Sequence, residues 1–129
     1  MKNPPTTEEI LAQLHPLNTL ADDRLLGIRD GLHYDKEGRE ITFWQWGKLH
    51  DCVEYIRIAD DTIGPYWVST VWIGLNHNWG GGPPLIFESM VFKGDESDLD
   101  CVRYSTLEQA LEGHARMVEE VRLFAELGE

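Results

Sequence analysis

One short stretch, residues 76–84, gathers the side chains best suited to binding chemistry. Two amides, an imidazole and an indole stand beside three glycines and two prolines: Asn76, His77, Asn78, Trp79, Gly80, Gly81, Gly82, Pro83 and Pro84. The rings and amides can stack on a planar ligand and hydrogen-bond its edges, and the N–H groups of successive glycines can hold an anion. Because three consecutive glycines are costly to order, we interpret residues 76–82 as a ligand-binding loop. The alternatives are a long hairpin loop whose glycines serve geometry only, and a catalytic loop.

Trp44 and Glu88 are two further candidate ligand-binding residues outside this loop. Trp44 falls on the outward side of an expected helix, where it points toward solvent or a partner. Glu88 falls in the middle of an expected strand, where a partly buried carboxylate needs Arg57, Arg103 or a ligand as its partner. A structural ion pair is the alternative interpretation of Glu88.

Motifs of the common enzyme and metal classes are missing from the sequence. It contains no C-x-x-C, H-x-x-x-H, G-x-S-x-G or Gly-Lys-Ser/Thr pattern. The run His50-Asp51-Cys52 could form one edge of a metal site, but a helix end is the simpler interpretation. His114 lies on the apolar stripe of the expected last helix, as a hydrogen-bonded core histidine. We therefore expect no catalytic residue, no metal and no cofactor, and reduced thiols at Cys52 and Cys101.

The arrangement of apolar and capping residues predicts the elements that position these groups. Three capping boxes mark helices: Thr6 with Glu9 before about residues 7–15, Thr42 with Gln45 before a helix that buries Phe43, Trp46 and Leu49, and Ser105 with Glu108 before a long amphipathic helix. Strands are expected at 54–63, 66–75 and 85–92, with an acidic loop at 93–99 and a short edge strand at 101–104.

This order of elements predicts one α+β domain over residues 1–129. An antiparallel sheet packs against the long C-terminal helix, and short helices precede it. Residues 1–5 are expected to be flexible, and residues 6–30 to form a helical N-terminal arm.

The composition excludes several classes of partner. The chain has 129 residues, with 11 Lys and Arg against 23 Asp and Glu, and therefore a formal net charge of −12. Because proteins bind the phosphate backbone mainly through Lys and Arg, duplex nucleic acid is not an expected partner. No apolar run approaches the roughly 20 residues that span a bilayer, so no membrane contact is expected.

The centre of the chain resembles a family of small uncharacterised proteins found in bacteriophages and prophages. The resemblance is carried by Val68–Leu75 and Gly81–Glu88, and it continues through Arg103–Thr106 to a helix with Ala110 and Gly113-His114. It implies a phage or prophage origin and the cytoplasm of the host cell, but it brings no activity and no catalytic residue.

Together these observations indicate a small phage-derived accessory protein that binds rather than catalyses. One class of phage accessory proteins sequesters nucleotide signals in aromatic-lined pockets, usually as oligomers. We therefore expect a nucleotide-type ligand at residues 76–82, with Trp44 and Glu88, and a homo-oligomer. The alternatives are an inhibitor that binds a host protein through its acidic surface, and a small metal-dependent hydrolase or nuclease that uses His77.

Overall fold

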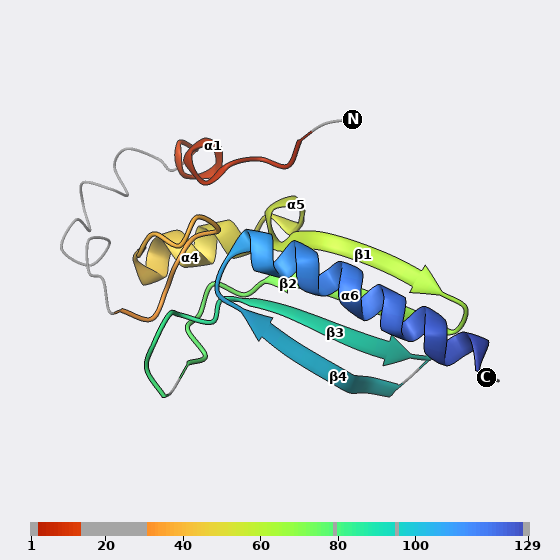
Figure 1. Cartoon of the computed structure of the whole chain (residues 1–129). Helices are drawn as coiled ribbons and strands as arrows, with labels where there is room; N and C mark the ends of the chain where they lie inside the picture. The colour runs from red at the N-terminus through yellow and green to blue at the C-terminus, as the bar shows by residue number, and fades with distance from the viewer. Residues whose placement is uncertain (1–2, 14–30, 79, 95, 128–129) are drawn as a thin grey trace.

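Four strands form one antiparallel sheet in the order β1-β2-β3-β4, so each strand pairs with its neighbours in the chain (Figure 1). The computed structural model describes residues 3–13, 31–78, 80–94 and 96–127, and only the backbone of residues 96–99. The strands are β1 (Arg57–Ile63), β2 (Tyr66–Trp72), β3 (Phe87–Lys93) and β4 (Glu96–Tyr104). With the long C-terminal helix and the short N-terminal helices, they make the single α+β domain that the sequence predicts.

The long helix α6 (Leu107–Glu126) covers one face of this sheet (Figure 1). Alternate residues of β2 and β3 are buried, as expected for strands with one covered face. Gly113 lets the helix approach β4, because a Cβ at this position would lie 2.1 Å from the hydroxyl oxygen of Tyr104. The cap of α6 is one residue later than predicted: Thr106 and Gln109 form the capping box, not Ser105 and Glu108.

His114 joins α6 to the sheet through a buried chain of hydrogen bonds. Its Nε2 lies 2.7 Å from a carboxylate oxygen of Asp61, and its Nδ1 lies 2.7 Å from Oγ1 of Thr70, which in turn lies 2.5 Å from Oγ of Ser89. Because an ionised carboxylate only accepts, Nε2 of His114 donates to Asp61. The prediction of a satisfied core histidine is confirmed, since only 5% of His114 is exposed.

Besides the core between α6 and the sheet, a second core lies where the N-terminal helices meet the beginning of the sheet. The helices are α1 (Thr7–Leu11), α4 (Phe43–His50) and α5 (Val53–Ile56), and the capping boxes of Thr6 and Thr42 form as predicted. Aromatic rings follow one another through this core with centroids 4.4 to 5.8 Å apart: Phe43, His33, Trp46, His50, Trp72 and Tyr55. Their polar atoms are paired; the Trp46 and His50 rings, for example, both donate to the carbonyl of Ile73.

Several further local predictions were wrong. The helix predicted over about residues 7–15 ends at Leu11 and is followed by a turn at Ala12 and Gln13. Phe43 is 64% exposed, because α4 turns Leu49 and Trp46 toward the core and leaves its first residue outside. Residues 53–56 form a helical turn, closed by the bond from the Ile56 N–H to the Cys52 carbonyl, and β1 begins only at Arg57. The acidic stretch expected to be a loop forms the first half of β4, because its backbone pairs with β3.

The N-terminal arm can be described only in part. Residues 7–11 are helical and residues 14–30 lie outside the described part of the chain. Neither Cys52 nor Cys101 is joined to another cysteine of the described residues. Among the helices of the described residues, none combines the length and the apolar character that crossing a membrane requires.

Candidate functional site

The predicted ligand loop is organised by its own asparagines. Oδ1 of Asn76 accepts from the backbone N–H groups of Asn78 and Leu85, at 2.8 and 3.1 Å. The amide of Asn78 donates to the carbonyl of Pro83 at 2.8 Å and accepts from the N–H of Gly80 at 3.2 Å. The oxygen of Asn76 and both ends of the Asn78 carboxamide therefore hold the loop in one shape.

Two of the three glycines are required by the shape of this loop. Gly81 and Gly82 have φ values of 85° and 89°, a left-handed conformation that favours glycine. A Cβ at Gly82 would also lie 3.3 Å from the amide nitrogen of Asn78. All three glycines are exposed, so another molecule can approach their backbone closely.

The ring of His77 is oriented by the chain next to it. Its Nδ1 lies 2.7 Å from the carbonyl oxygen of Leu75, and because a carbonyl only accepts, Nδ1 carries the proton. Trp79, the predicted stacking residue, lies outside the described residues.

Trp44 and Glu88 are not brought to this loop by any contact of the described residues. Trp44 lies on α4 and is 40% exposed, with the ammonium of Lys48 5.8 Å from the centroid of its indole. Glu88 lies on β3, where it accepts from the thiol of Cys101 at 3.1 Å and pairs with the guanidinium of Arg103 at 3.3 Å. The alternative interpretation of Glu88, a structural ion pair, thus describes its surroundings.

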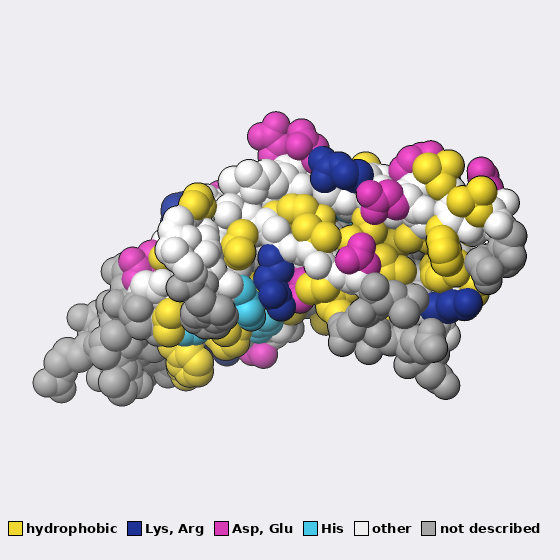
Figure 2. Space-filling model, turned by 60° about the horizontal axis from the view of Figure 1, so that its bottom comes forward, with side chains coloured by type: hydrophobic (Ala, Val, Ile, Leu, Met, Phe, Trp, Pro, Cys, Tyr) yellow, Lys and Arg dark blue, Asp and Glu magenta, His cyan; other side chains and the backbone are white. Residues whose placement is uncertain are grey.

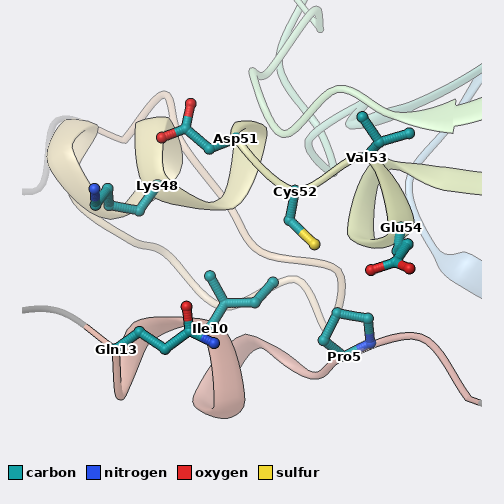
Figure 3. Close-up of a pocket in the computed structure, with 8 residues that line it drawn as sticks. All are labelled: Pro5, Ile10, Gln13, Lys48, Asp51, Cys52, Val53 and Glu54. Atoms are coloured by element: carbon teal, nitrogen blue, oxygen red, sulfur yellow. The ribbon is translucent and has the colours of Figure 1, made fainter.

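A hollow of about 710 Å³ lies between α1 and the junction of α4 with α5, on the side of α4 that carries Lys48 (Figure 3). We call it the α1–α4 hollow, and its lining residues are Pro5, Ile10, Gln13, Lys48, Asp51, Cys52, Val53 and Glu54. In Figure 3 the side chains of Ile10 and Cys52 point toward each other across it, and Pro5 closes the space beside Glu54. The sequence gives little sign of this hollow, because its walls are separated by about forty residues and meet only when α1 packs on α4.

A network of buried polar groups surrounds Tyr55, the residue of α5 that faces the core. Burial raises the pKa of Tyr55 to about 12, although its hydroxyl bonds with Thr7 at 2.6 Å and accepts from the N–H of Lys36 at 3.0 Å. The ammonium of Lys36 lies over the same ring, 4.3 Å from its centroid. Burial lowers the pKa of Lys36, and the nearby Glu37 and Cys52 oppose that effect.

The other face of the sheet, which we call the open face, carries an exposed aromatic pair. Cross-strand pairing places its side chains in three rows: Arg57, Val71, Glu88 and Arg103; Asp60, Ser69, Met90 and Cys101; and Thr62, Trp67 and Phe92. Trp67 is 43% exposed and stacks on Phe92 with centroids 4.8 Å apart, while its indole N–H donates to the carboxylate of Asp60. Sequence analysis missed this pair, because strand alternation alone does not show which face a helix covers.

A smaller apolar groove of about 390 Å³ runs between α6 and the sheet, lined by Tyr66, Val91, Asp100, Met117, Glu120, Val121 and Phe124. Figure 2 shows the molecule turned so that the β4 edge comes forward, and hydrophobic side chains form a band across this side with acidic side chains along its border. The groove itself is mostly apolar, with Asp100 and Glu120 as its two carboxylates.

Within the described residues, no group of three or more His, Cys, Asp or Glu side chains is placed to hold a metal ion. The chain was also compared with known proteins: no family model, no curated protein and no solved structure matches it. Its function therefore has to be inferred from the geometry and chemistry of its own surfaces.

Proposed function

We propose that this chain is a binding protein and not an enzyme, and that its ligand occupies the α1–α4 hollow. The observation that carries the proposal is the hollow itself, whose volume of about 710 Å³ falls within the roughly 300–1,000 Å³ of small-molecule sites. Pro5, Ile10 and Val53 offer it apolar surface, and a few charged groups stand at its border. The lining is therefore divided between apolar side chains, which can contact the body of an organic ligand, and polar ones, which can fix its orientation.

The absence of catalysis is supported by where the acid–base groups lie. The chain Asp61–His114–Thr70 joins a carboxylate, an imidazole and a hydroxyl in the order used by hydrolases. Its hydroxyl end is enclosed, since neither Thr70 nor Ser89 has any exposed surface. A substrate cannot reach that oxygen, so we assign the chain a structural role.

The charges around the hollow favour a ligand with an apolar body and a cationic end. The charged residues among its lining are two carboxylates, Asp51 and Glu54, and one ammonium, Lys48. That ammonium already lies near the indole of Trp44, which is one helical turn away. An organic amine would find both an apolar wall and an excess of negative charge, whereas a phosphate would be repelled.

A nucleotide-type ligand at residues 76–82, held by a phage-derived accessory protein in the host cytoplasm, is our second proposal. It is supported by the exposed backbone of Gly80, Gly81 and Gly82, which an anion can approach closely. It has less support than the first proposal because the oxygen of Asn76 and the carboxamide of Asn78 are engaged within the loop.

Thermal-shift and calorimetric titrations with phenethylamine, phenylacetate and AMP separate these proposals. Phenethylamine should raise the melting temperature, and phenylacetate, with the same ring but the opposite charge, should not. Glu54→Gln should weaken phenethylamine binding two- to fivefold, which corresponds to the roughly 0.4–1 kcal/mol of a solvent-screened ion pair. Glu112→Gln, at an exposed position of α6, is the matched control and should bind as the wild type does.

The opposite pattern would overturn the first proposal. If AMP binds and phenethylamine does not, and Gly82→Ala abolishes AMP binding, the ligand belongs to the glycine loop. If neither probe binds at millimolar concentration, the α1–α4 hollow is not a site for either class.

A further inference from the structure

We propose that the open face of the sheet is the interface of a symmetric homodimer. This proposal is independent of the α1–α4 hollow, because none of the residues that line the hollow belongs to the open face. It gives a structural basis to the homo-oligomer that the sequence leads us to expect.

The open face has the anatomy of a protein interface. Its middle is apolar, with Val71, Met90, Trp67 and Phe92 on the two central strands. Its edges carry ion pairs: Arg57 with Asp60 at 3.8 Å on β1, and Arg103 with Glu88 at 3.3 Å between β4 and β3. An apolar centre with a charged rim is typical of specific protein contacts.

The aromatic anchor of this face is held in place before any partner arrives. Trp67 is fixed on one side by its hydrogen bond to Asp60 and on the other by stacking on Phe92. A rigid, exposed tryptophan loses little conformational entropy on binding, and tryptophan is enriched among the residues that dominate binding energy.

The charge balance of the face indicates a second copy of the chain as its occupant. The chain as a whole carries −12, yet the described side chains of the open face include two guanidinium groups and two carboxylates. A basic partner would gain more from other, acidic surfaces. Two identical chains, in contrast, repel each other least where the charges of the described side chains balance.

Two-fold symmetry gives a specific arrangement of the rows. An axis that crosses the strands at the level of Ser69 and Met90 places the row of Val71 against the partner's row of Trp67, and the reverse. An axis parallel to the strands would instead bring Arg57 and Arg103 of the two copies together. We therefore infer the first arrangement, in which the apolar side chains of the two central strands meet, and the like-charge contact between the two copies of Asp60 lies at the β1 edge.

The edges of the sheet are less suited to self-association than its face. The outer strands carry Asp60 and Asp61 on β1 and Asp100 on β4, and acidic residues on edge strands oppose edge-to-edge pairing.

The size of the face predicts a weak dimer. Four strands about 4.8 Å apart and about six residues of roughly 3.4 Å each give a flat footprint near 400 Å² per chain. The two footprints together give about 800 Å², which is below the roughly 1,000 Å² of stable specific interfaces and typical of weak, transient ones, so we expect a dissociation constant of about 10–100 µM. Because both chains are strongly acidic, raising the salt concentration should strengthen the dimer by screening their repulsion.

Sedimentation equilibrium of the full chain from 5 to 500 µM, in 0.05 and 0.5 M NaCl, tests the proposal. The wild type should form dimers, more strongly in high salt. Trp67→Lys should remain monomeric at 500 µM, although it lowers the net negative charge and so the repulsion. Leu111→Lys places the same charge at a similarly exposed apolar position of α6, and it should dimerise as the wild type does. Circular dichroism establishes that each variant is folded.

The proposal is overturned if the wild type is monomeric at 500 µM in 0.5 M NaCl. It is also overturned if folded Trp67→Lys dimerises like the wild type, or if Leu111→Lys weakens the dimer as much as Trp67→Lys does. Failure of the dimer would leave the ligand titrations of the α1–α4 hollow unaffected.

Discussion

Gly74 offers the sharpest test of how the aromatic core is packed. Its φ is 71°, and a Cβ on it would lie 2.3 Å from Cζ2 of Trp72 and 2.9 Å from Cδ1 of Trp46. Gly74→Ala therefore has two costs. A left-handed alanine costs roughly 1–2 kcal/mol, and forcing a methyl group between two packed rings adds about 1–3 kcal/mol. We expect a total loss of about 2–5 kcal/mol in the free energy of unfolding.

Gly64→Ala is the matched control for the backbone cost. Gly64 also has a left-handed backbone, with φ of 59°, but a Cβ there would meet nothing within 4 Å. This variant should lose only the conformational cost of roughly 1–2 kcal/mol. Urea denaturation followed by tryptophan fluorescence measures both. Equal losses for the two variants would refute the packing of Trp46 and Trp72 around Gly74.

Three further predictions concern single groups. The pKa of Tyr55 is raised to about 12 by burial, so its contribution to stability is complete below pH 10 and is lost between pH 10 and 12. The stability difference between the wild type and Tyr55→Phe should shrink over that range in urea titrations, and a constant difference would contradict the burial of the hydroxyl. Asn78→Ala removes the bonds to Pro83 and Gly80, so limited proteolysis should cut residues 76–84 faster while the free energy of unfolding falls by less than about 1 kcal/mol. Thr106→Ala should cost about 1 kcal/mol through loss of the helix cap, whereas Ser105→Ala should cost less; the reverse order in urea denaturation would favour the cap that sequence analysis chose.

The parts of the fold that local chemistry decides could be predicted from the sequence. Two capping boxes form at the predicted residues, because a threonine and a Glu or Gln three residues later satisfy each other's backbone groups. The third was misplaced by one residue because Ser105/Glu108 and Thr106/Gln109 both fit the pattern. The apolar stripe of α6 identified the helix and the burial of His114, although Leu111 and Phe124 on the same stripe are exposed.

Long-range packing accounts for what could not be predicted. Aspartate has a low strand propensity, yet the stretch before Cys101 forms a strand. Its backbone pairs with β3, and this long-range pairing outweighs the local propensity of its side chains. Phe43 was expected inside, but the helix position that faces the core is decided by what α4 packs against. No local sequence pattern indicates the α1–α4 hollow, because its walls come from distant segments of the chain. For the glycine loop, the sequence indicated an unusual backbone at Gly81 and Gly82, but not that Asn76 and Asn78 would be used to hold it.

The most direct test of the proposed function maps where an organic amine binds. The amide signals of the ¹⁵N-labelled chain are followed by NMR while phenethylamine is added. We expect saturable shifts at Ile10, Lys48, Cys52, Val53 and Glu54, which line the α1–α4 hollow, and none at Gly80–Gly82. Shifts confined to those glycines, or no saturable shift anywhere in the chain, would contradict the assignment of the hollow as the ligand site.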